Sequence, residues 1–473
     1  MDIKTLHEKL KNKEITVYSY IKNIYENIEK NKYNSFITLN KEEALKKAKK
    51  LDKEIENGKE ISGLLGVPVA VKDNIITKNL KTTAASKSLE NFIPFFNADV
   101  IEKLNQTDAI LIGKANMDEF AMGSSSETSH FGASINPYDE SLTAGGSSTG
   151  VGTAIAGKEA IVGIGTDTGG SVRNPADYTH TVGFAPTYGA ISRYGTISMA
   201  NSFDRVGVMG NNVYDIKVLF NALRGKSEND FTSVDVEELN DFEKNININE
   251  LNIAVFELKD EYQVDKEIIE EFNETIEKLE KLGANIERVS IKNLEYINQA
   301  YTVITCIEVE SNMARIDGLR YGESIEKYEN MDDFYIQNRT NNFGEEVKRR
   351  LALGNFFASK DNNQIYYKQA MKIRNSIKTQ VEEILSKFDI ILSPTTTRLP
   401  KKVGETSEDS NASFDSGMFN TITNLSNLPA ISLPMKKDRL GSIQIIANRN
   451  QDLKLLEIAE KIEGEIKWKQ LSV

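Results

Sequence analysis

The sequence predicts an α/β fold in which strands and helices alternate along the chain. Two observations carry this prediction: short apolar runs of strand length recur between segments with helical spacing, and glycine is dense between residues 143 and 210. The chain has 473 residues, of which 39% are hydrophobic, enough for one large core or two ordinary ones. No linker rich in Pro, Gly or Ser separates two halves, so we expect a single domain over residues 1–473.

The elements follow from the period of the apolar residues. Residues 1–60 show helical spacing and predict packed surface helices, residues 62–210 form a glycine-rich core, and residues 211–473 supply the rest of the sheet and its covering helices. Helical spacing is also found over 264–282 and on to residue 388. The predicted strands are 66–71, 109–113, 161–165, 253–256, 286–291, 389–393 and 442–446. The polar runs 226–250 and 401–413 are expected to be surface loops.

Composition narrows the function. A single cysteine, Cys306, and three histidines leave little material for a disulfide or a metal site, so we expect no metal and no cofactor in this chain. The formal charge of -12 argues against the chain holding a nucleic acid by itself. No apolar stretch approaches the roughly 20 residues of a membrane span, and residues 1–13 are polar. We therefore expect a cytoplasmic enzyme.

Two serines stand after glycines in the dense segment. Ser147 lies in Gly145-Gly-Ser-Ser-Thr-Gly150, and Ser171 lies in Gly165-Thr-Asp-Thr-Gly-Gly-Ser-Val-Arg173. A serine on such a turn can be exposed beside converging backbone N–H groups, which stabilise the oxyanion formed when an amide carbonyl is attacked. A purely structural turn and a phosphate loop are the competing interpretations. The Gly-Lys-Ser/Thr of a P-loop is absent, which weakens the second of them.

A serine nucleophile needs a base, and two side chains are candidates. His180 has no Gly-x-Ser-x-Gly elbow near it, which favours a packed or surface histidine. Lys72 ends a buried apolar strand, where loss of solvent favours the neutral amine that can accept a proton. Alone, such a lysine is more often one that reaches solvent from a strand end.

Taken together, these motifs resemble the amidase signature family over residues 66–210. Its pattern is a lysine after a Gly-x-Pro strand, then Gly-Gly-Ser-Ser, then Thr-Asp-x-Gly-Gly-Ser-x-Arg. The resemblance implies a central, mixed, twisted sheet covered by helices on both faces. It also implies that Ser171 is the acyl-forming nucleophile, that Ser147 follows a cis peptide bond and relays the proton, and that Lys72 is the base.

The same resemblance assigns the residues around the nucleophile. Backbone N–H groups of Thr168, Gly169, Gly170 and Ser171 would form the oxyanion hole. Asp167 and Arg173 would be the pair that braces this loop.

Within the family the chain is similar to the A subunits of glutamyl-tRNA(Gln) and aspartyl-tRNA(Asn) amidotransferases. The similarity rests on the run Asn116-Met-Asp-Glu-Phe-Ala-Met-Gly-Ser124 and on Pro186-Thr-Tyr-Gly189, Ser192-Arg-Tyr-Gly195 and Tyr366-Tyr-Lys368. It implies hydrolysis of glutamine and delivery of ammonia to a misacylated tRNA. The implied partners are a tRNA-binding, kinase-like B subunit, which would hold most of the tRNA and use ATP, and a small C subunit.

Substrate recognition is where the chain departs from that pattern. The resemblance implies that Arg350 pairs with the α-carboxylate of glutamine, but the aspartate that would take the α-amino group is replaced by Gly417. Asp415 is the nearest candidate to replace it, although a plain surface acid is an equally reasonable interpretation. Three other departures, expected near the pocket or its rim, are Thr149 for glycine, Thr179-His180 for Cys-Gly and Ala185 for lysine.

Three alternatives remain. A stand-alone amidase for other small amides would keep the same triad without partners. A catalytically silent scaffold is disfavoured because all three separated triad residues are present. A nucleotide-binding protein lacks the lysine or acidic ribose partner that its glycine-rich turns would need.

Overall fold

One mixed β-sheet runs through the molecule, and its strands come from almost the whole length of the chain. The structure is a computed structural model that describes residues 1–473 except 238, 240–245, 406–416, 437–439 and 467–473. The described strands form a sheet of 11 in the order β1-β3-β2-β4-β6-β5-β10-β11-β9-β7-β8. Their bounds are β1 Phe36–Leu39, β2 Pro68–Lys72, β3 Ile110–Ala115, β4 Val162–Asp167, β5 Val182–Ala185, β6 Arg205–Gly210, β7 Asn252–Phe256, β8 Asn285–Val289, β9 Ile390–Pro394, β10 Ala430–Pro434 and β11 Ser442–Ile446.

Pairing in the sheet is parallel at two places and antiparallel elsewhere. β2 lies parallel between β3 and β4, and β7 lies parallel between β8 and β9. The two parallel units meet through an antiparallel centre in which β5 pairs with β10, so that Ala185 lies opposite Ala430. The first and last thirds of the chain therefore share one sheet. The predicted α/β fold with a mixed central sheet is confirmed.

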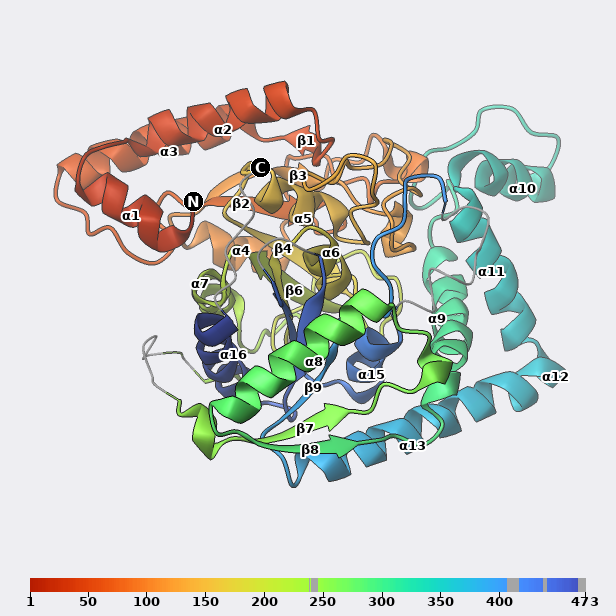
Figure 1. Ribbon diagram of the computed structural model, residues 1–473. Coiled ribbons are helices and arrows are strands. Elements are labelled where there is room, and N and C mark those ends of the chain that lie inside the picture. The colour runs from red at the N-terminus through yellow and green to blue at the C-terminus, as the bar shows by residue number, and fades with distance from the viewer. Residues whose placement is uncertain (238, 240–245, 406–416, 437–439, 467–473) are drawn as a thin grey trace.

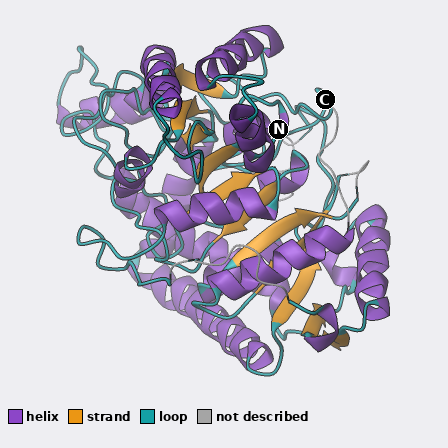
Figure 2. Cartoon of the chain, turned by 90° about the vertical axis from the view of Figure 1, so that its left-hand side faces the viewer, coloured by secondary structure: helices purple, strands orange, loops and turns teal. Residues whose placement is uncertain are grey.

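Helices cover both faces of this sheet, as Figures 1 and 2 show. The alternation of side chains along single strands explains why. In β7, Ile253 and Val255 belong to one large apolar cluster, whereas Ala254 and Phe256 belong to a second. Because successive side chains of a strand point to opposite faces, both faces are apolar and both must be covered.

The helices differ in how they meet that requirement. Their bounds are α1 Ile3–Lys11, α2 Val17–Asn31, α3 Lys41–Glu56, α4 Asp99–Asn105, α5 Thr149–Ala156, α6 Arg173–Tyr178, α7 Val213–Leu223, α8 Lys266–Lys281, α9 Ile297–Met313, α10 Met331–Asn342, α11 Glu345–Ala358, α12 Lys360–Asn362, α13 Lys368–Leu385, α15 Met418–Ser426 and α16 Asp452–Ile466. The short α5, which follows the glycine turn, is buried along its whole length. By contrast, α2 is amphipathic and starts with a capping box between Thr16 and Ser19. None of the described helices is both long and apolar enough to cross a bilayer.

Comparison with the predicted elements shows which strands and helices can be predicted from the pattern of apolar residues. All seven predicted strands are present within a few residues, and the helices expected over 1–60, 264–282 and up to 388 are confirmed. The strands that were not predicted are β1, β5, β6 and β10. β5 and β6 lie inside the glycine-rich segment, where glycine and arginine interrupt the apolar run. The run 401–413 is described only to residue 405, which lies in a turn.

Candidate active site

The site begins at the end of β2, where the strand delivers Lys72 into the protein interior. Lys72 is fully buried, and its Nζ donates to Ser147 Oγ at 2.7 Å and to the Thr166 carbonyl at 3.3 Å. β2 and β4 are parallel neighbours, so their carboxyl ends lie at the same edge of the sheet. Lys72 at the end of β2 and Ser147 before α5, which are far apart in the sequence, are in direct contact at this edge.

Burial determines the charge state of this lysine. Loss of solvent lowers the pKa of Lys72 to about 7, although the carboxylates of Asp118, Asp167 and Asp204 act in the opposite direction. A pKa near 7 makes the neutral amine available near neutral pH, as a general base requires.

Ser147 is positioned by the turn before α5. The peptide bond between Gly146 and Ser147 is cis, as the resemblance implies. The Gly146 N–H donates to Asn174 Oδ1 at 2.9 Å. A Cβ atom on Gly146 would lie 2.1 Å from Asp118 Oδ2, so a larger residue at this position would displace the Asp118 carboxylate. The turn is also tied to the second serine loop, because the Ser148 N–H donates to the Ser171 carbonyl at 3.0 Å.

Ser171 follows β4 on a loop that leads into α6. It is 8% exposed, which distinguishes it from Ser147 at 0%, and it lines the main pocket together with Gly169 and Gly170. Gly170 has a φ of 117°, a value that favours glycine. The accessible serine of the pair is thus the one that the resemblance assigns as nucleophile.

The backbone donors of this loop are not equivalent. The Gly170 N–H donates to Asp167 Oδ1 at 3.0 Å and is therefore already engaged. The N–H groups of Thr168, Gly169 and Ser171 donate to none of the residues that the structure describes. The oxyanion hole proposed over residues 168–171 consequently depends on these three donors rather than on four.

Asp167 and Arg173 form a buried ion pair under the loop. The Arg173 Nη2 atom lies 2.9 Å from Asp167 Oδ1, and Nε donates to Oδ2 at 3.1 Å. Asn424 also donates to Asp167 at 2.8 Å. Burial alone would raise the pKa of the Asp167 carboxyl, but the charges of Arg173 and Arg205 hold it well below its usual range. The other guanidinium nitrogen of Arg173 reaches α15 through Thr423 Oγ1 at 2.7 Å, so this pair joins the catalytic loop to the pocket wall.

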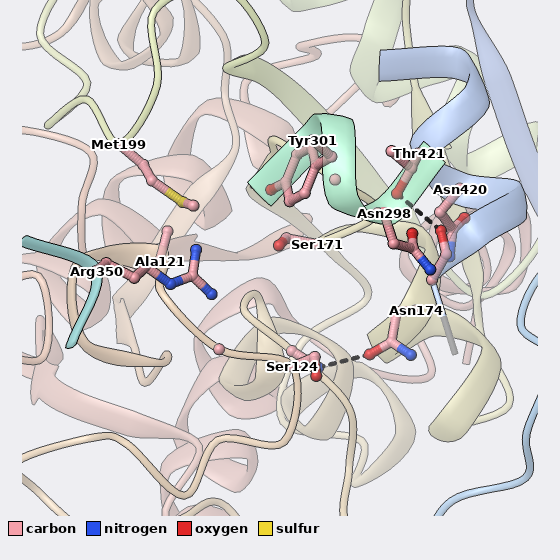
Figure 3. A pocket seen from close by; sticks show the side chains of 15 residues that line it. Ala121, Ser124, Ser171, Asn174, Met199, Asn298, Tyr301, Arg350, Asn420 and Thr421 are labelled. Carbon is pink, nitrogen blue, oxygen red and sulfur yellow. Dashed lines mark hydrogen bonds between the residues drawn. The ribbon is translucent and has the colours of Figure 1, made fainter. Parts of the chain in front are cut away.

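Figure 3 shows the pocket around Ser171. Arg350 enters from one side, Tyr301 lies beside the serine, and Asn298, Asn420 and Thr421 gather on the opposite side. The described lining is Ala121, Gly123, Ser124, Gly146, Gly169, Gly170, Ser171, Asn174, Met199, Asn298, Tyr301, Arg350, Gly417, Asn420 and Thr421. Within that described lining, the one charged side chain is that of Arg350.

Arg350 is held from within its own helix. Its side chain is 6% exposed, and its Nε donates to Glu346 Oε1 at 2.6 Å. The amino end of α11, which carries both residues, is anchored by the Gly344 N–H, which donates to Glu119 Oε2 at 2.8 Å. The predicted carboxylate-binding arginine therefore lines the same pocket as Ser171.

The predicted partner for the substrate amine cannot be placed. Asp415 lies outside the described residues, as do most of those in the run 401–413. Gly417 is described: it precedes α15 and lines the pocket. No aspartate or glutamate is found in the described lining. The role of Asp415 stays a prediction.

The other departures were expected near the pocket or its rim, and Thr149, Thr179 and Ala185 are not among the described lining residues. Thr149 is the first residue of α5, and its hydroxyl donates to the Gly145 carbonyl at 2.6 Å. Thr179 donates to the Pro175 carbonyl at 2.6 Å, and Ala185 pairs with β10. These three residues are held by contacts with neighbouring backbone.

His180 is placed as a packed residue. It is 2% exposed, and its Nε2 lies 2.7 Å from the Lys436 carbonyl oxygen. It is not in the described pocket lining. Among the described residues no cluster of His, Cys, Asp or Glu is arranged to hold a metal ion.

Sequence reasoning missed three residues that the structure brings to the site. Asp118 is fully buried beside the Lys72 and Ser147 pair, Tyr301 lines the pocket from α9, and Asn420 lines it from α15. Asp118 lies inside the run that supported the subfamily resemblance, so its presence was a usable signal. Tyr301 and Asn420 carry no local motif and meet the site only through the fold.

With this geometry established, comparison with known proteins identifies the family. A family model described as Amidase matches residues 18–456. The chain belongs to the amidase family. It is 39% identical to the A subunit of glutamyl-tRNA(Gln) amidotransferase from Staphylococcus epidermidis over 98% of this chain and 96% of the relative. It is 41% identical to the corresponding protein of Saccharolobus solfataricus, which has the same name, over 97% of this chain and 95% of the relative.

Solved structures of amidases have the same fold as this chain. The crystal structure of the glutamyl-tRNA(Gln) amidotransferase A subunit from Thermotoga maritima matches with a TM-score of 0.76 and 32% identity, covering 95% of this chain and 94% of that one. A bacterial aryl acylamidase of the amidase signature family matches with a TM-score of 0.84 but only 21% identity, covering 99% and 96%. The second likeness shows the fold alone.

Proposed function

We propose that this amidase hydrolyses the side-chain amide of glutamine and supplies the ammonia to a transamidation reaction on misacylated tRNA, as the A subunit of an amidotransferase. The observation that carries the proposal is the similarity over nearly the full length to proteins of that name in both Staphylococcus epidermidis and Saccharolobus solfataricus. The contact between Lys72 and Ser147 beside an accessible Ser171 supports the chemistry.

In the proposed reaction Ser171 Oγ attacks the amide carbon. Its proton passes through the Ser147 hydroxyl to neutral Lys72, and the resulting oxyanion accepts hydrogen bonds from the free N–H groups of the 168–171 loop. Collapse breaks the C–N bond, and the proton returns from Lys72 through Ser147 to the departing ammonia. Water then attacks the acyl ester by the same relay, so that glutamine and water give glutamate and ammonia.

The proposed partners are a tRNA-binding, kinase-like B subunit and a small C subunit. The formal charge of -12 supports leaving the tRNA to a partner, since phosphate contacts depend on clustered Lys and Arg. Whether the acceptor is Glu-tRNA or Asp-tRNA depends on those partners. Coupling to a partner would also prevent the loss of glutamine to uncoupled hydrolysis.

Ammonia release tests the proposal. The purified chain, alone and co-expressed with its partner subunits, is incubated with glutamine, asparagine and a simple aliphatic amide. We expect slow release from glutamine by the chain alone and faster release when partners and misacylated tRNA are added. Full turnover of the aliphatic amide without any partner, with glutamine left intact, would assign the chain as a stand-alone amidase.

A further inference from the structure

Asp118 is a buried carboxylate that the reaction described above does not use. Its side chain is 0% exposed, and it lies in the loop between β3 and the short 3-10 helix η2 (Glu119–Ala121). One oxygen, Oδ1, accepts from Thr128 Oγ1 at 2.9 Å. The other, Oδ2, has no hydrogen-bond partner among the residues that the structure describes. A buried carboxylate oxygen without a donor is costly, which calls for a reason to keep it there.

The free oxygen faces the catalytic turn. A Cβ atom on Gly146 would lie 2.1 Å from Asp118 Oδ2, so this oxygen lies against the peptide bond that precedes Ser147. The Asp118 N–H also donates to the Ser147 carbonyl, at 3.4 Å. Asp118 therefore touches the backbone of the serine whose hydroxyl receives the hydrogen bond from Lys72.

Three carboxylates, from different segments of the chain, act on the charge of Lys72, and they differ in their own partners. Asp167 at the end of β4 is paired with Arg173 and lies 3.9 Å from Arg205 Nε. Asp204 accepts from Thr168 Oγ1 and from two backbone N–H groups. Neither Asp118 nor Asp204 forms an ion pair with an arginine or lysine among the described residues, but of these two only Asp118 has a carboxylate oxygen, Oδ2, without a hydrogen-bond partner there.

We propose that Asp118 is a positioning residue that supplies the counter-charge for Lys72 when this lysine holds the proton of the nucleophile. Burial favours the neutral lysine, which is the form that accepts a proton, but it penalises the ammonium that results. A fixed carboxylate behind the Gly146 peptide offsets that penalty without contacting the substrate. The glycine at position 146 is then required because its missing side chain allows the carboxylate to approach. This inference rests on the proposed role of Lys72 as the base.

The alternative is that Asp118 only braces the loop around Thr128. The two roles predict different results, because a brace acts through geometry and a counter-charge acts through the acidity of Lys72. Removing the charge should lower the pKa of Lys72, so the rising limb of the rate against pH should move to lower pH. Removing only the Thr128 hydrogen bond should not move it.

The test measures kcat/KM against pH for the wild type and for Asp118→Asn, Asp118→Ala and the matched control Thr128→Val. Each is assayed in the co-expressed complex with glutamine and with a simple aliphatic amide. We expect both Asp118 variants to shift the rising limb down by about one pH unit or more, with a plateau rate lower by about tenfold, and Thr128→Val to keep the limb at the wild-type position.

A second measurement is independent of turnover. The pH titration of the Lys72 side chain is followed by NMR with 13Cε-labelled lysine, and its signal is assigned by its loss in Lys72→Ala. We expect a lower midpoint in Asp118→Asn than in the wild type. An unchanged midpoint, or a Thr128→Val variant that reproduces the shift, overturns the proposal. A wild type that hydrolyses the aliphatic amide but not glutamine would contradict the proposed function, while the same pH curves would still decide the role of Asp118.

Discussion

The side chains on the two sides of the pocket differ in how fully they are hydrogen-bonded. On the catalytic side, Asp167 accepts hydrogen bonds from its own loop, from Arg173 and from Asn424, and Lys72 is bonded directly to Ser147. On the wall formed by α15, which packs against Gly170 of this loop, Asn420 is fully buried, yet neither its amide oxygen nor its amide nitrogen has a hydrogen-bond partner among the described residues. Gly417, which lines the same wall, contributes no side chain.

This difference separates the reaction from its specificity. The groups proposed to break the amide bond are determined by many mutual contacts, which keeps their geometry fixed in the absence of substrate. The wall that would recognise the rest of the substrate retains a side-chain amide, that of Asn420, with no hydrogen-bond partner among the described residues. We therefore expect substitutions on the catalytic side to affect every amide alike, and those on the wall to discriminate between amides.

The largest effect is expected at Ser171. Ser171→Ala should abolish hydrolysis of all amides, because the acyl ester can no longer form. Treatment of the wild type with an electrophilic amide analogue, followed by peptide mass spectrometry, should place the label on Ser171. Label on Ser147 or Ser148 would instead mean that the loops exchange roles.

Substitution of Lys72 should lower activity nearly as much. The pH dependence of the wild-type rate should show at which pH this lysine loses its proton. Lys72→Ala and Lys72→Arg should both lower kcat by at least about 100-fold, since a guanidinium that is always charged cannot accept a proton. In the wild type, kcat/KM should rise with pH through about 7, as Lys72 loses its proton. A rate that is flat between about pH 5 and 9 would exclude this lysine as the base.

Among the groups expected to bind the rest of the substrate, Arg350 lies across the pocket from Asn420, and Arg350→Ala should reduce kcat/KM for glutamine by about 10- to 100-fold, the value of one lost hydrogen bond to a charged group. A simple aliphatic amide, which has no carboxylate, should be hydrolysed as before. Arg349→Ala is the matched control: it removes the neighbouring arginine, which also pairs with Glu346 but is not in the described lining. Equal losses for both substrates would assign Arg350 to packing.

Asp415→Asn belongs to the same comparison. If Asp415 takes the α-ammonium of glutamine, this variant should lose glutamine hydrolysis selectively, as Arg350→Ala does. If the variant hydrolyses both glutamine and the aliphatic amide as before, Asp415 is a plain surface acid, and the pocket recognises the amine in another way.

The smallest effect is expected at His180, which packs against the Lys436 carbonyl. His180→Ala should leave kcat within about threefold of the wild type, because a residue outside the pocket contributes only through local packing. A loss of kcat comparable to that of Lys72→Ala would instead indicate that His180 is the base. The catalytic groups would then not be confined to the side of the pocket that carries Lys72 and the two serines.

The sequence alone predicted the strands with continuous apolar runs and the glycine turns of the catalytic side, because these features depend on residues close together in the chain. β5 and β6 could not be found in this way, since their burial comes from pairing with each other and with β4 and β10. The same limit applied to the pocket. Thr149 and Thr179, which were expected near the pocket or its rim, donate hydrogen bonds to backbone carbonyls and are not among the described lining residues.

What the sequence determined by itself is therefore the class of fold, the family and the choice of Lys72, Ser147 and Ser171 as candidate catalytic residues, whose motifs are local and specific. What only the tertiary structure decided is which groups meet them. Tyr301, Arg350 and Asn420 come from α9, α11 and α15, far from the serines in the chain, and Asp118 acquires its importance only because Gly146 lets it approach. A pocket wall is assembled by long-range packing, and its electrostatics depend on burial and distance, neither of which is encoded in a short run of residues.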